Sequence, residues 1–587
     1  PNGNGNVFKS LDKYGYKLEK NNKSDWGFND KFMYEIAKER LTEISKKDQP
    51  FSETLISIDT HFPDGYKGDY TLNKYSTQYE NVYATESKLL GDFINWIKEQ
   101  EFYKDTTIVI MGDHLNMQTE YFKKYDQNKR KRYNVIINSV AKYDKKNTQN
   151  RKFVLNTFGC QMNQADAQRM RGILLPMGYV ETENEEEADL ILFNTCSVRQ
   201  HAEERLFGRI RSLAPLKRQN PKLVIGVSGC MAQNHKSELL KQLPMVDIVF
   251  GPNDINQLPQ LLEEADSKKK ALGSFAGKGT FEGETADGIV LTRPFSAMVN
   301  IIRGCTNFCA YCIVPYVRGP EISRPLDELI AYIKDLASKG VKEVLLLGQN
   351  VNVYGKDLGM KEGFATLLEE IEKIDGIKWV RFLTSHPRDF TEEAIKRISK
   401  LTKVCEQYHL PFQAGNNRVL EVMRRGYTRE RYLDLIRQVR ENIPGVSLST
   451  DIICGFPGET EEEFEETIDL VKQVRYESAY MYYYSPRPGT KAAAMKEQLS
   501  DEVKKGRLAR LIEVQNQISN EESQKQIGKT FEVLVETCAS RSENRMLGKT
   551  RTGRPVDFEG DESMIGNFVN VKITAARNYT LSGVLVK

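Results

Sequence analysis

The stretch SAMVNIIRGCTNFCAYC, residues 296–312, joins an apolar strand pattern to a loop that contains three cysteines. In that loop, Cys305, Cys309 and Cys312 are separated by three and then two residues. A structural zinc site needs four ligands, and its cysteines usually come as pairs with short gaps on both sides. Three thiolates on a four-iron cluster would instead leave one iron open to a substrate. Whether this loop holds a cluster with such a vacant position is a question for the rest of the sequence.

Strand and helix patterns alternate outward from this loop, from about residue 295 to 515. The strand patterns include EVLLLGQN, WVRFLTSHP, YHLPFQAG, SLSTDIICGFPG and AYMYYYSP, with amphipathic helices such as PLDELIAYIKDLASKG between them. Six such units predict a full or partial (β/α) barrel over residues 295–520, with its active site at the carboxyl ends of the strands.

A second set of cysteines, Cys160, Cys196 and Cys230, is spread through residues 150–265, where the pattern predicts a Rossmann-like parallel α/β domain. Each cysteine ends a predicted strand, in KFVLNTFGC, ADLILFNTC and KLVIGVSGC. Because the carboxyl ends of neighbouring parallel strands meet at one crevice, we expect these three thiolates to converge there. Small or turn-forming residues precede each cysteine and would let the backbone approach a bulky inorganic group. The alternative is three buried, inert cysteines.

The chain has nine cysteines in 587 residues, too few for a disulfide scaffold, and six of them fall into these two sets. This usage suits thiolate metal ligands in a reducing compartment. For the loop at 305–312, a structural zinc site that takes a distant ligand such as His386 or His409 is the alternative.

The cysteine loop after the first barrel strand resembles that of the radical S-adenosylmethionine (SAM) superfamily. Over about residues 150–587 the resemblance narrows to the MiaB-type tRNA methylthiotransferases. The matching strings are FGCQMNQADAQRM, NTCSVRQHAEERLFGRI, RGCTNFCAYCIVPYVRG, LLLGQNVNVYG, HLPFQAGNNRVLEVMRRGYTRERYLDLI, DIICGFPGET and YSPRPGT. The string after Cys196 is similar to that of enzymes acting on isopentenylated adenosine. Pro320 departs from the family, which more often has arginine there, and this concerns a substrate or loop contact and not the chemistry.

The resemblance implies a radical SAM enzyme that adds a methylthio group to carbon 2 of N6-isopentenyladenosine at position 37 of tRNA, next to the anticodon. It implies two 4Fe-4S clusters, and SAM both as radical source and as methyl donor. The catalytic and metal-binding residues would be the SAM trio (Cys305, Cys309 and Cys312) and the auxiliary trio (Cys160, Cys196 and Cys230). The alternatives are methylthiolation of threonylcarbamoyl-adenosine or of a ribosomal-protein aspartate, a non-catalytic RNA-binding protein with structural metal sites, and a metal-dependent hydrolase.

The resemblance also suggests residues that bind SAM. Gln349 and Asn350 lie at a strand end where related enzymes hold the SAM amino group, and Gln413, Arg424 and the backbone near Gly455 are further candidates. All lie at the carboxyl ends of strands, the face where barrel active sites form. The alternative for each is a polar residue that stabilises a loop.

The last segment, residues 524–587, changes to short alternating strands and glycine turns, which predicts a small all-β barrel. It resembles a TRAM domain, an OB-like RNA-binding module. Its loop RSENRMLGKTRTGR predicts a surface that contacts phosphates, with Arg541, Arg545, Lys549, Arg551 and Arg554 as RNA-binding residues. A merely solvated basic loop is the alternative. The run MRRGYTRERY, residues 423–432, either contributes to RNA binding or is an ordinary solvated helix face.

Residues 1–145 are polar and rich in tyrosine and lysine, with a charged boundary at their end. Over residues 24–140 they resemble a truncated sulfatase-like phosphoglycerol transferase, a partial α/β segment, in SIDTHFPDGY and IVIMGDHLN. Asp113 and His114 match metal ligands of that family, and His61 lies in the other matching loop. The nucleophile would lie before Pro1, so we expect no phosphotransfer or sulfatase activity.

Composition fits a globular, cytoplasmic protein, with 40% apolar and 28% charged residues and no apolar window long enough to span a membrane. The net charge of only +3 means that RNA contacts must come from local basic patches. Residues 266–294, rich in glycine and lysine, predict a flexible linker. We expect a monomer whose partners are a tRNA anticodon stem-loop, a low-potential electron donor of the flavodoxin or ferredoxin type, and a sulfur supplier.

Overall fold

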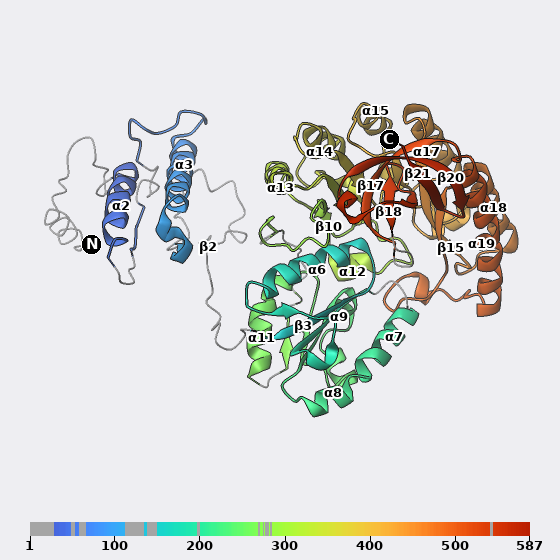
Figure 1. The fold of residues 1–587 in the computed structure, drawn as a ribbon, viewed down its shortest axis with the longest axis horizontal. Helices are drawn as coiled ribbons and strands as arrows, with labels where there is room; N and C mark the ends of the chain where they lie inside the picture. Colours follow the sequence, from blue (N-terminus) through green and yellow to red (C-terminus); the bar gives the residue numbers. More distant parts are fainter. Residues whose placement is uncertain are drawn as a thin grey trace. The chain divides into compact units, whose positions relative to one another are not determined.

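The computed structural model describes residues 29–47, 53–57, 66–111, 134–137, 150–196, 200–267, 270–273, 275, 281, 284–539 and 544–586. The chain divides into two compact units, Pro1–Asp144 and Lys145–Lys587 (Figure 1). None of the described helices is both long enough and apolar enough to cross a membrane.

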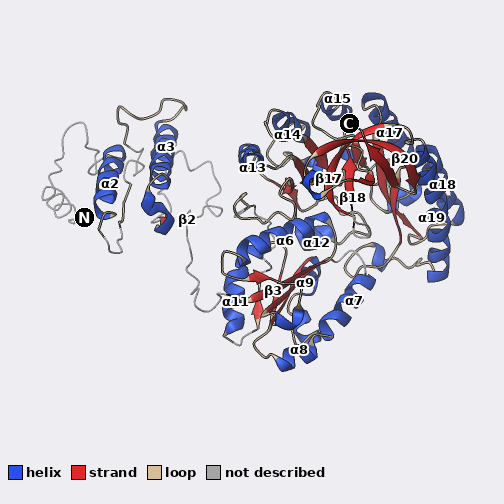
Figure 2. Cartoon of the chain, in the orientation of Figure 1, coloured by secondary structure: helices blue, strands red, loops and turns tan. Residues whose placement is uncertain are grey.

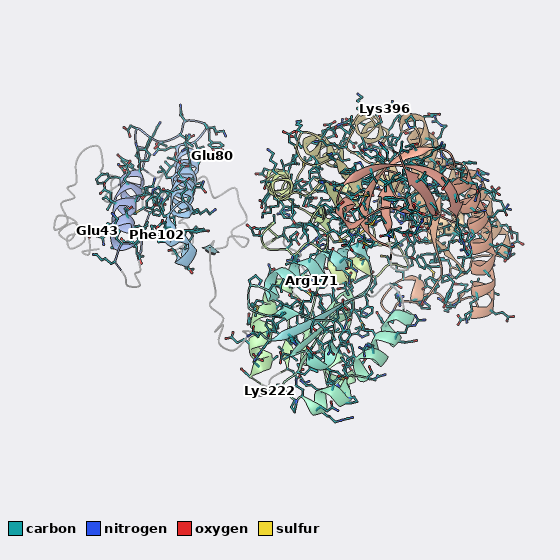
Figure 3. All side chains as sticks on the ribbon, in the orientation of Figure 1. Glu43, Glu80, Phe102, Arg171, Lys222 and Lys396 are labelled. Atoms are coloured by element: carbon teal, nitrogen blue, oxygen red, sulfur yellow. The ribbon has the colours of Figure 1, made fainter. Side chains whose placement is uncertain are left out.

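The first unit is built on two helices and an antiparallel strand pair. Its described elements are α2 (Asp30–Ile44), α3 (Gln78–Lys98), β1 (Ile108–Met111) and β2 (Asn134–Ile137). The helices bury Tyr34 and Leu41 against Phe93 and Ile97, and Phe102 packs edge-on against Trp96 (Figure 3). The predicted metal ligands Asp113 and His114, together with His61, lie outside the described residues.

A six-stranded parallel sheet opens the second unit. Its strand order is β4-β3-β5-β6-β7-β8, in which the chain runs first to one side of β3 and then to the other. The strands are β3 (Lys152–Thr157), β4 (Val180–Glu181), β5 (Leu190–Thr195), β6 (Val224–Gly229), β7 (Ile248–Phe250) and β8 (Ala271–Leu272). The helices are α6 (Gln161–Leu174), α7 (Gln200–Arg211), α8 (Ala214–Gln219), α9 (Cys230–His235), α10 (Glu238–Gln242) and α11 (Leu258–Asp266). Both β5 and β6 are buried along their whole length, as central parallel strands are.

Parts of the segment 266–294, predicted as a flexible linker, lie within the described residues and contact the folded chain. Its residues Ala271–Leu272 form β8, the edge strand of the parallel sheet. Glu284 is buried, and the amide of Val290 donates to the Gln168 carbonyl at 3.1 Å. The glycine-rich composition hid these contacts, since they depend on partners far away in the chain.

The next part contains six further parallel strands in two three-stranded sheets, β13-β12-β9 and β14-β15-β16. A bridge between Val380 and Val404 connects the two, so the predicted partial barrel is confirmed (Figure 2). The strands are β9 (Ser296–Asn300), β12 (Glu343–Leu347), β13 (Trp379–Phe382), β14 (Gln407–His409), β15 (Ser447–Cys454) and β16 (Ser478–Tyr483). The helices are α13 (Leu326–Ser338), α14 (Gly363–Glu372), α15 (Glu392–Ile398), α16 (Asn417–Val422), α17 (Arg429–Asn442) and α18 (Glu461–Val474). Helix α12 (Val314–Arg318) and the strand pair β10 (Ile302–Arg303) and β11 (Ile322–Ser323) frame the SAM trio.

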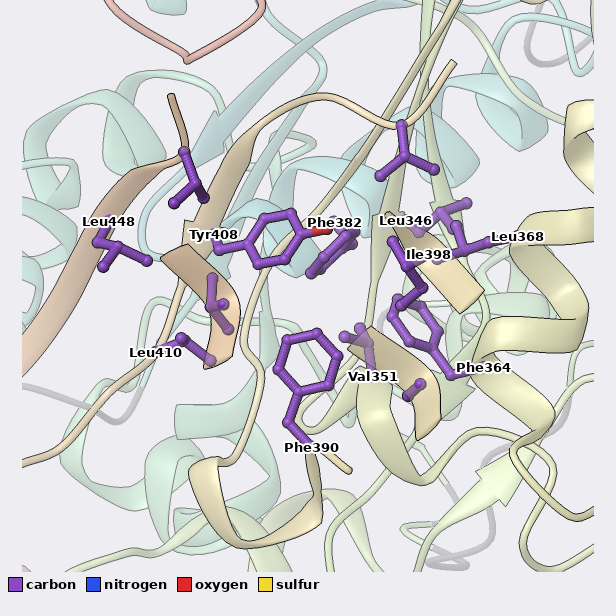
Figure 4. Packing of buried hydrophobic residues seen from close by; sticks show 14 of the residues in the cluster. Leu346, Val351, Phe364, Leu368, Phe382, Phe390, Ile398, Tyr408, Leu410 and Leu448 are labelled. Carbon is purple, nitrogen blue, oxygen red and sulfur yellow. The ribbon is translucent and has the colours of Figure 1, made fainter. Parts of the chain in front are cut away.

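Apolar side chains fill the space between these strands and the surrounding helices. Phe382 and Tyr408 meet at 4.9 Å between ring centroids, and Phe390 packs at 5.9 Å from Tyr408 (Figure 4). Leu346 and Leu410 complete this layer of the core. The packed interior leaves the carboxyl ends of the strands as the place for a site.

A long helix, α19 (Asp501–Gln524), leads to a closed five-stranded barrel of order β17-β18-β19-β21-β20. Its strands are β17 (Thr530–Cys538), β18 (Arg545–Thr550), β19 (Pro555–Glu559), β20 (Phe568–Arg577) and β21 (Thr580–Leu585). The small all-β barrel predicted for the carboxyl-terminal segment is therefore confirmed. It rests on the larger barrel, because Arg381 of β13 donates to the carbonyls of Thr550 and Arg551, each at 2.7 Å.

Candidate metal and cofactor site

The auxiliary trio lies at the carboxyl end of the six-stranded sheet. Cys160 caps the start of α6 after β3, Cys196 follows β5, and Cys230 begins α9 after β6. The strands β3 and β5 flank the point where the strand order reverses, which is where open α/β sheets bind ligands. The three strand ends are neighbours as predicted, and the role of the cysteines as ligands stays a prediction.

Two glycines make this close approach possible. Gly159 has a φ of 119°, and a Cβ atom there would lie 2.5 Å from the Cβ of Cys196. Gly229 has a φ of 91°, and its Cβ would lie 2.3 Å from the Thr195 carbonyl oxygen. A larger residue at either position would combine backbone strain with a steric clash, so glycine is required for the strand ends to meet.

Polar side chains link the members of the auxiliary trio. The Cys160 thiol donates to Oδ1 of Asn163 at 3.3 Å, and Nδ2 of Asn163 donates to the Thr195 carbonyl at 2.9 Å. Nε of Arg318 donates to the Cys230 sulfur at 3.3 Å. Sequence reasoning missed both residues, although Asn163 lies only three positions after Cys160.

The SAM trio lies in a loop fixed by backbone hydrogen bonds. The Cys305 amide donates to the Gly319 carbonyl at 3.0 Å, and the Cys312 amide donates to the Cys309 carbonyl at 3.0 Å. Gly304 has a φ of 78°, and a Cβ there would lie 1.9 Å from the carbonyl oxygen of Pro320. The backbone carbonyl of Pro320 therefore lies against the turn that carries Cys305.

Desolvation raises the pKa of two thiols of the SAM trio, Cys305 and Cys312. Burial raises the pKa of Cys305 to about 11. Burial and the neighbouring Cys309 together raise the pKa of Cys312 to about 12. Iron must therefore displace protons when it binds, since the thiolate is the ligand.

A buried cation beside the SAM trio indicates that the site is built for an anion. Arg425 is 4% exposed and donates to the Cys309 sulfur at 3.4 Å and to the Pro411 carbonyl at 2.7 Å. Among the described residues no carboxylate contacts this guanidinium, whose other partners are the hydroxyls of Tyr311 and Tyr427. A buried charge without a counter-charge is costly, and a thiolate-ligated iron–sulfur cluster would supply one.

The arrangement fits a cluster better than a single metal ion. In the part of the chain that the structure describes, no group of three or more His, Cys, Asp or Glu side chains is placed to hold one ion. Burial and the guanidinium groups of Arg425 and Arg388 lower the pKa of His386 to about 2, and the His409 ring contacts Ser449 at 3.0 Å. The lowered pKa keeps the His386 ring neutral, which is the form that binds metals. The zinc alternative lacks support for a different reason, since among the described residues neither histidine belongs to a group of three placed to hold one ion. A four-iron cluster binds each thiolate at a different iron, so its ligands need not converge on one point.

Two predicted SAM contacts, Gln349 and Asn350, differ in their surroundings. Asn350 is 1% exposed, donates to Asp389 at 2.7 Å and accepts from the His386 amide at 3.2 Å, so its amide already stabilises the loop. The Gln349 side chain donates to the Met162 sulfur, next to the auxiliary trio, and its Oε1 has no hydrogen-bond partner. Of the two, Gln349 keeps an acceptor for a ligand.

The other three residues predicted to bind SAM also differ in their surroundings. Gln413 has a φ of 71° and a buried Oε1 without a hydrogen-bond partner, which is a feature of a binding position. The Gly455 amide is already used, since it donates to Glu459 at 2.6 Å. Arg424 is exposed, and its neighbour Arg425 is the arginine that reaches the SAM trio. SAM binding by all five stays a prediction.

The basic residues of the carboxyl-terminal barrel form contacts within the protein. Arg545 pairs with Asp557 at 2.7 Å, and Lys549 pairs with Glu536 at 2.9 Å, both partly exposed. Arg551 pairs with Glu406 at 2.9 Å, across the boundary between the two barrels. Arg554 is 3% exposed and donates to Ser523 at 2.9 Å, so a phosphate contact would require it to leave this position. Arg541 lies outside the described residues, and RNA binding by this group stays a prediction.

The run at residues 423–432 is less available to RNA than its composition suggests. Tyr432 is 1% exposed, and the Tyr427 hydroxyl donates to the Phe412 carbonyl at 2.9 Å. Arg429 pairs with Asp469, and Arg431 pairs with Asp434 at 3.0 Å. These contacts agree with the alternative of an ordinary helix face.

An exposed aromatic pair at the SAM trio was not singled out from the sequence. Phe308 is 45% exposed with a φ of 46°, and its ring meets that of Tyr316, 52% exposed, at 5.7 Å. The preceding residues are fixed, because Thr306 donates to Glu321 at 2.8 Å. A positive φ at a bulky residue stores strain, and such strain is concentrated at functional sites.

Family models match four parts of the chain. They are a sulfatase model over residues 2–154, an uncharacterised family, UPF0004, over 152–251, the radical SAM superfamily over 299–471, and the TRAM domain over 524–586. The SAM trio lies in the radical SAM match, and the auxiliary trio lies in the UPF0004 match.

Curated relatives match most of the second unit. A tRNA-2-methylthio-N(6)-dimethylallyladenosine synthase of Thermoanaerobacter pseudethanolicus is 48% identical over 465 residues, which is 78% of this chain and 97% of the relative. The protein of the same name from Carboxydothermus hydrogenoformans is 48% identical over 440 residues, 74% of this chain and 99% of the relative.

The solved structures that match this chain have a much lower sequence identity to it than the curated relatives do. The radical SAM methyltransferase TsrM from Kitasatospora setae, with cobalamin and a [4Fe-4S] cluster bound, has a TM-score of 0.43 at 14% identity and covers 59% of this chain and 74% of its own. The cobalamin-dependent radical SAM enzyme OxsB has a TM-score of 0.39 at 12% identity, covering 82% of this chain and 69% of its own.

Proposed function

This chain belongs to the family of tRNA-2-methylthio-N(6)-dimethylallyladenosine synthases, which are radical SAM tRNA methylthiotransferases, and we propose that it acts at position 37 of tRNA, next to the anticodon. There it adds a methylthio group to carbon 2 of N6-isopentenyladenosine. The observation that carries the proposal is the presence of two cysteine trios at strand ends in a chain 48% identical to named synthases.

The two trios would hold two 4Fe-4S clusters. When bound, the clusters and SAM supply reductive cleavage of SAM, hydrogen abstraction from the adenine, and transfer of sulfur and a methyl group. The chain supplies the ligands, the burial and the charge balance. At the SAM trio, Arg425 compensates negative charge at Cys309. The Oε1 atoms of Gln349 and Gln413 are acceptors that suit the SAM amino group.

The burial of the site serves the same reaction. One cysteine of each trio, Cys305 and Cys230, is buried, as are the guanidinium groups that contact the two trios, whereas Cys196, Cys309 and Cys312 are partly exposed and Cys160 is exposed. A site that excludes water strengthens these electrostatic contacts and protects a reactive intermediate from side reactions. Desolvation is therefore part of what the protein contributes.

The proposal includes partners that match this chemistry. They are a tRNA anticodon stem-loop, a low-potential electron donor of the flavodoxin or ferredoxin type, and a sulfur supplier, all in the cytoplasm. The TRAM match supports RNA binding by the carboxyl-terminal barrel. We propose that the enzyme acts as a monomer with the domains 150–265, 295–520 and 524–587, and that residues 1–145 take no part.

Mass spectrometry of tRNA nucleosides tests the proposed reaction. The anaerobically reconstituted enzyme, SAM and a reductant should convert N6-isopentenyladenosine in tRNA to its 2-methylthio derivative. Methylthiolation of threonylcarbamoyl-adenosine or of a ribosomal-protein aspartate would instead show that the enzyme belongs to another branch of the methylthiotransferases. RNA binding without any product, and with zinc in place of iron, would support the non-catalytic alternative.

Replacement of single cysteines distinguishes the functions of the two trios. A Cys309→Ala variant should lose SAM cleavage, because its cluster would lack a ligand beside the vacant iron. A Cys196→Ala variant should still cleave SAM and should yield no methylthiolated product. Release of 5′-deoxyadenosine and of methylthiolated nucleoside, measured in the same reaction, gives both readouts. Loss of SAM cleavage in the Cys196 variant with an intact SAM cluster would contradict this division.

A further inference from the structure

The last residue of α12 reaches from the loop of the SAM trio to the auxiliary trio. Arg318 lies six positions after Cys312 and is 5% exposed. Its Nε donates to the sulfur of Cys230 at 3.3 Å, a contact between residues 88 positions apart. Ile313 and Val317 of the same segment pack against Cys230 and bury the sulfur that Arg318 contacts.

A second nitrogen of Arg318 links this contact to the rest of the auxiliary trio. Nη2 donates to Oδ2 of Asp166 at 3.2 Å and to Oδ1 of Asn163 at 3.4 Å. The same Asn163 oxygen accepts from the Cys160 thiol, and the Asn163 amide holds the carbonyl just before Cys196. The Arg318 guanidinium therefore contacts Cys230 directly. Through Asn163 it is also linked to the Cys160 thiol and to the carbonyl that precedes Cys196.

The charges around this contact are buried, and they include Arg303, which interacts electrostatically with both Asp166 and Arg318 and pairs with Glu284. Asp166 is 1% exposed and lies 4.0 Å from Arg169, which pairs with Glu284 at 3.2 Å. Coulomb interactions are strong where water is excluded, so a positive charge at Arg318 and a negative charge at Asp166 both act on a group bound to Cys230. The direction of their effects is opposite.

We propose that Arg318 is a positioning residue that holds the auxiliary trio and raises the reduction potential of the cluster bound there. The inference rests on the proposed function, which places a 4Fe-4S cluster on Cys160, Cys196 and Cys230. Hydrogen bonds to cluster sulfurs and nearby charge tune cluster potentials. An N–H···S bond from a cation stabilises the reduced, more negative cluster, and Arg318 thereby couples the loop of one trio to the redox state of the other.

The test is a redox titration of the auxiliary cluster in the full-length chain. The SAM trio is replaced by alanine, so that the electron paramagnetic resonance signal comes from the auxiliary trio alone. In this background Arg318→Gln should shift the midpoint potential to a more negative value. Arg318→Lys should keep it nearer that of the parent, because lysine retains the charge. Asp166→Asn should shift it to a more positive value.

Folding is controlled by a paired variant. Arg318→Gln alone leaves the buried Asp166 without its nearer cationic partner, so the Arg318→Gln/Asp166→Asn chain is compared with Asp166→Asn. The two differ only at Arg318, and the double variant should have the more negative potential. Arg171 lies on α6, the helix that carries Asp166, and pairs with Glu181 at 2.9 Å on the surface (Figure 3). Arg171→Gln should leave the potential of the auxiliary cluster unchanged.

The possible failures are distinguishable. If the parent chain without the SAM trio binds no iron, the auxiliary cluster of the proposed function fails. If all variants bind about four irons per chain and their potentials agree, only the role of Arg318 is overturned. Loss of iron from both the glutamine and the lysine variants would also count against it, since a retained charge should preserve loading.

Discussion

Two adjacent arginines differ completely in what they can do. Arg424 is exposed with a φ of 60°, whereas Arg425 is buried and donates to Cys309. The left-handed conformation at Arg424 turns the chain between them, so helical periodicity does not reveal which one faces the site. The buried arginine is consequently the one on which the SAM trio depends.

Replacement of Arg425 should therefore impair loading of the SAM trio. In Arg425→Met the counter-charge for an anionic cluster is lost, and we expect iron bound at this trio to fall to a minor fraction of wild type. Iron analysis in a chain with the auxiliary trio replaced by alanine measures this directly. Arg424→Met is the matched control and should load normally; the reverse order of effects would refute the assignment.

The exposed ring of Phe308 is suited to stack on a base at the mouth of the site. Its strained backbone, the fixed residue Thr306 before it and the edge-on Tyr316 hold it in place. Loss of one base–aromatic stack costs ~1–3 kcal/mol. We expect Phe308→Ala to weaken tRNA binding accordingly while SAM cleavage without RNA persists. Filter binding with an isopentenylated stem-loop checks this, and Tyr316→Phe, which keeps its ring, should bind as wild type does.

At the scale of elements, the buried pair of Glu343 on β12 and Arg381 on β13 links neighbouring strands at 2.7 Å. Burial alone would raise the pKa of the Glu343 carboxyl, but Arg381 and the Ser296 hydroxyl outweigh it and lower that pKa below 4.5. The pair therefore stabilises the fold above pH 4.5, and this contribution is lost as the pH falls through the lowered pKa of the folded state.

Glu343→Gln should cost about 3 kcal/mol of unfolding free energy at neutral pH, because it leaves Arg381 buried without its partner. The difference from wild type should shrink as the pH falls below 4.5, once the wild-type carboxyl is also protonated. Urea denaturation at several pH values measures both effects. If the difference in unfolding free energy between the two chains stayed constant down to the lowest pH measured, the charge of Glu343 would not contribute to stability.

The strands were predictable because their patterns are local, and the contacts between elements were not. KFVLNTFGC, ADLILFNTC and KLVIGVSGC each end a strand at a cysteine, and a parallel sheet brings such ends together. The bond from Arg318 to Cys230 joins residues that only the packing of α12 on α9 makes neighbours. Likewise, the loop RSENRMLGKTRTGR shows its charge in the sequence, but not that Glu406 and Ser523 occupy two of its arginines.

For the whole molecule, the carboxyl-terminal barrel is fixed to the larger barrel by aromatic packing, hydrogen bonds and the ion pair of Arg551 with Glu406. Trp379 is 1% exposed, donates to Glu532 at 3.2 Å and meets the Phe568 ring at 4.8 Å. Leu534 packs beside it. The barrel that the TRAM model matches is thus held in a defined place relative to the site.

Trp379→Ala should loosen this attachment at a cost of ~3 kcal/mol, the usual range for a buried tryptophan. We expect limited proteolysis to release the carboxyl-terminal barrel faster than from wild type, and tRNA binding to fall. Trp96→Ala in the first unit is the control and should leave the release rate unchanged. Equal rates in all three chains would mean that the contact does not hold the barrel.

The buried guanidinium beside Cys309 also has a consequence for the life of the newly made chain. Before iron arrives, this pocket contains a buried cation that no described carboxylate contacts, an arrangement that favours opening of the loop to water. A bound iron–sulfur cluster would supply the missing counter-charge and would favour the closed loop. Maturation and folding are thereby one event at this loop, and cells short of iron should accumulate a form that proteases recognise and remove.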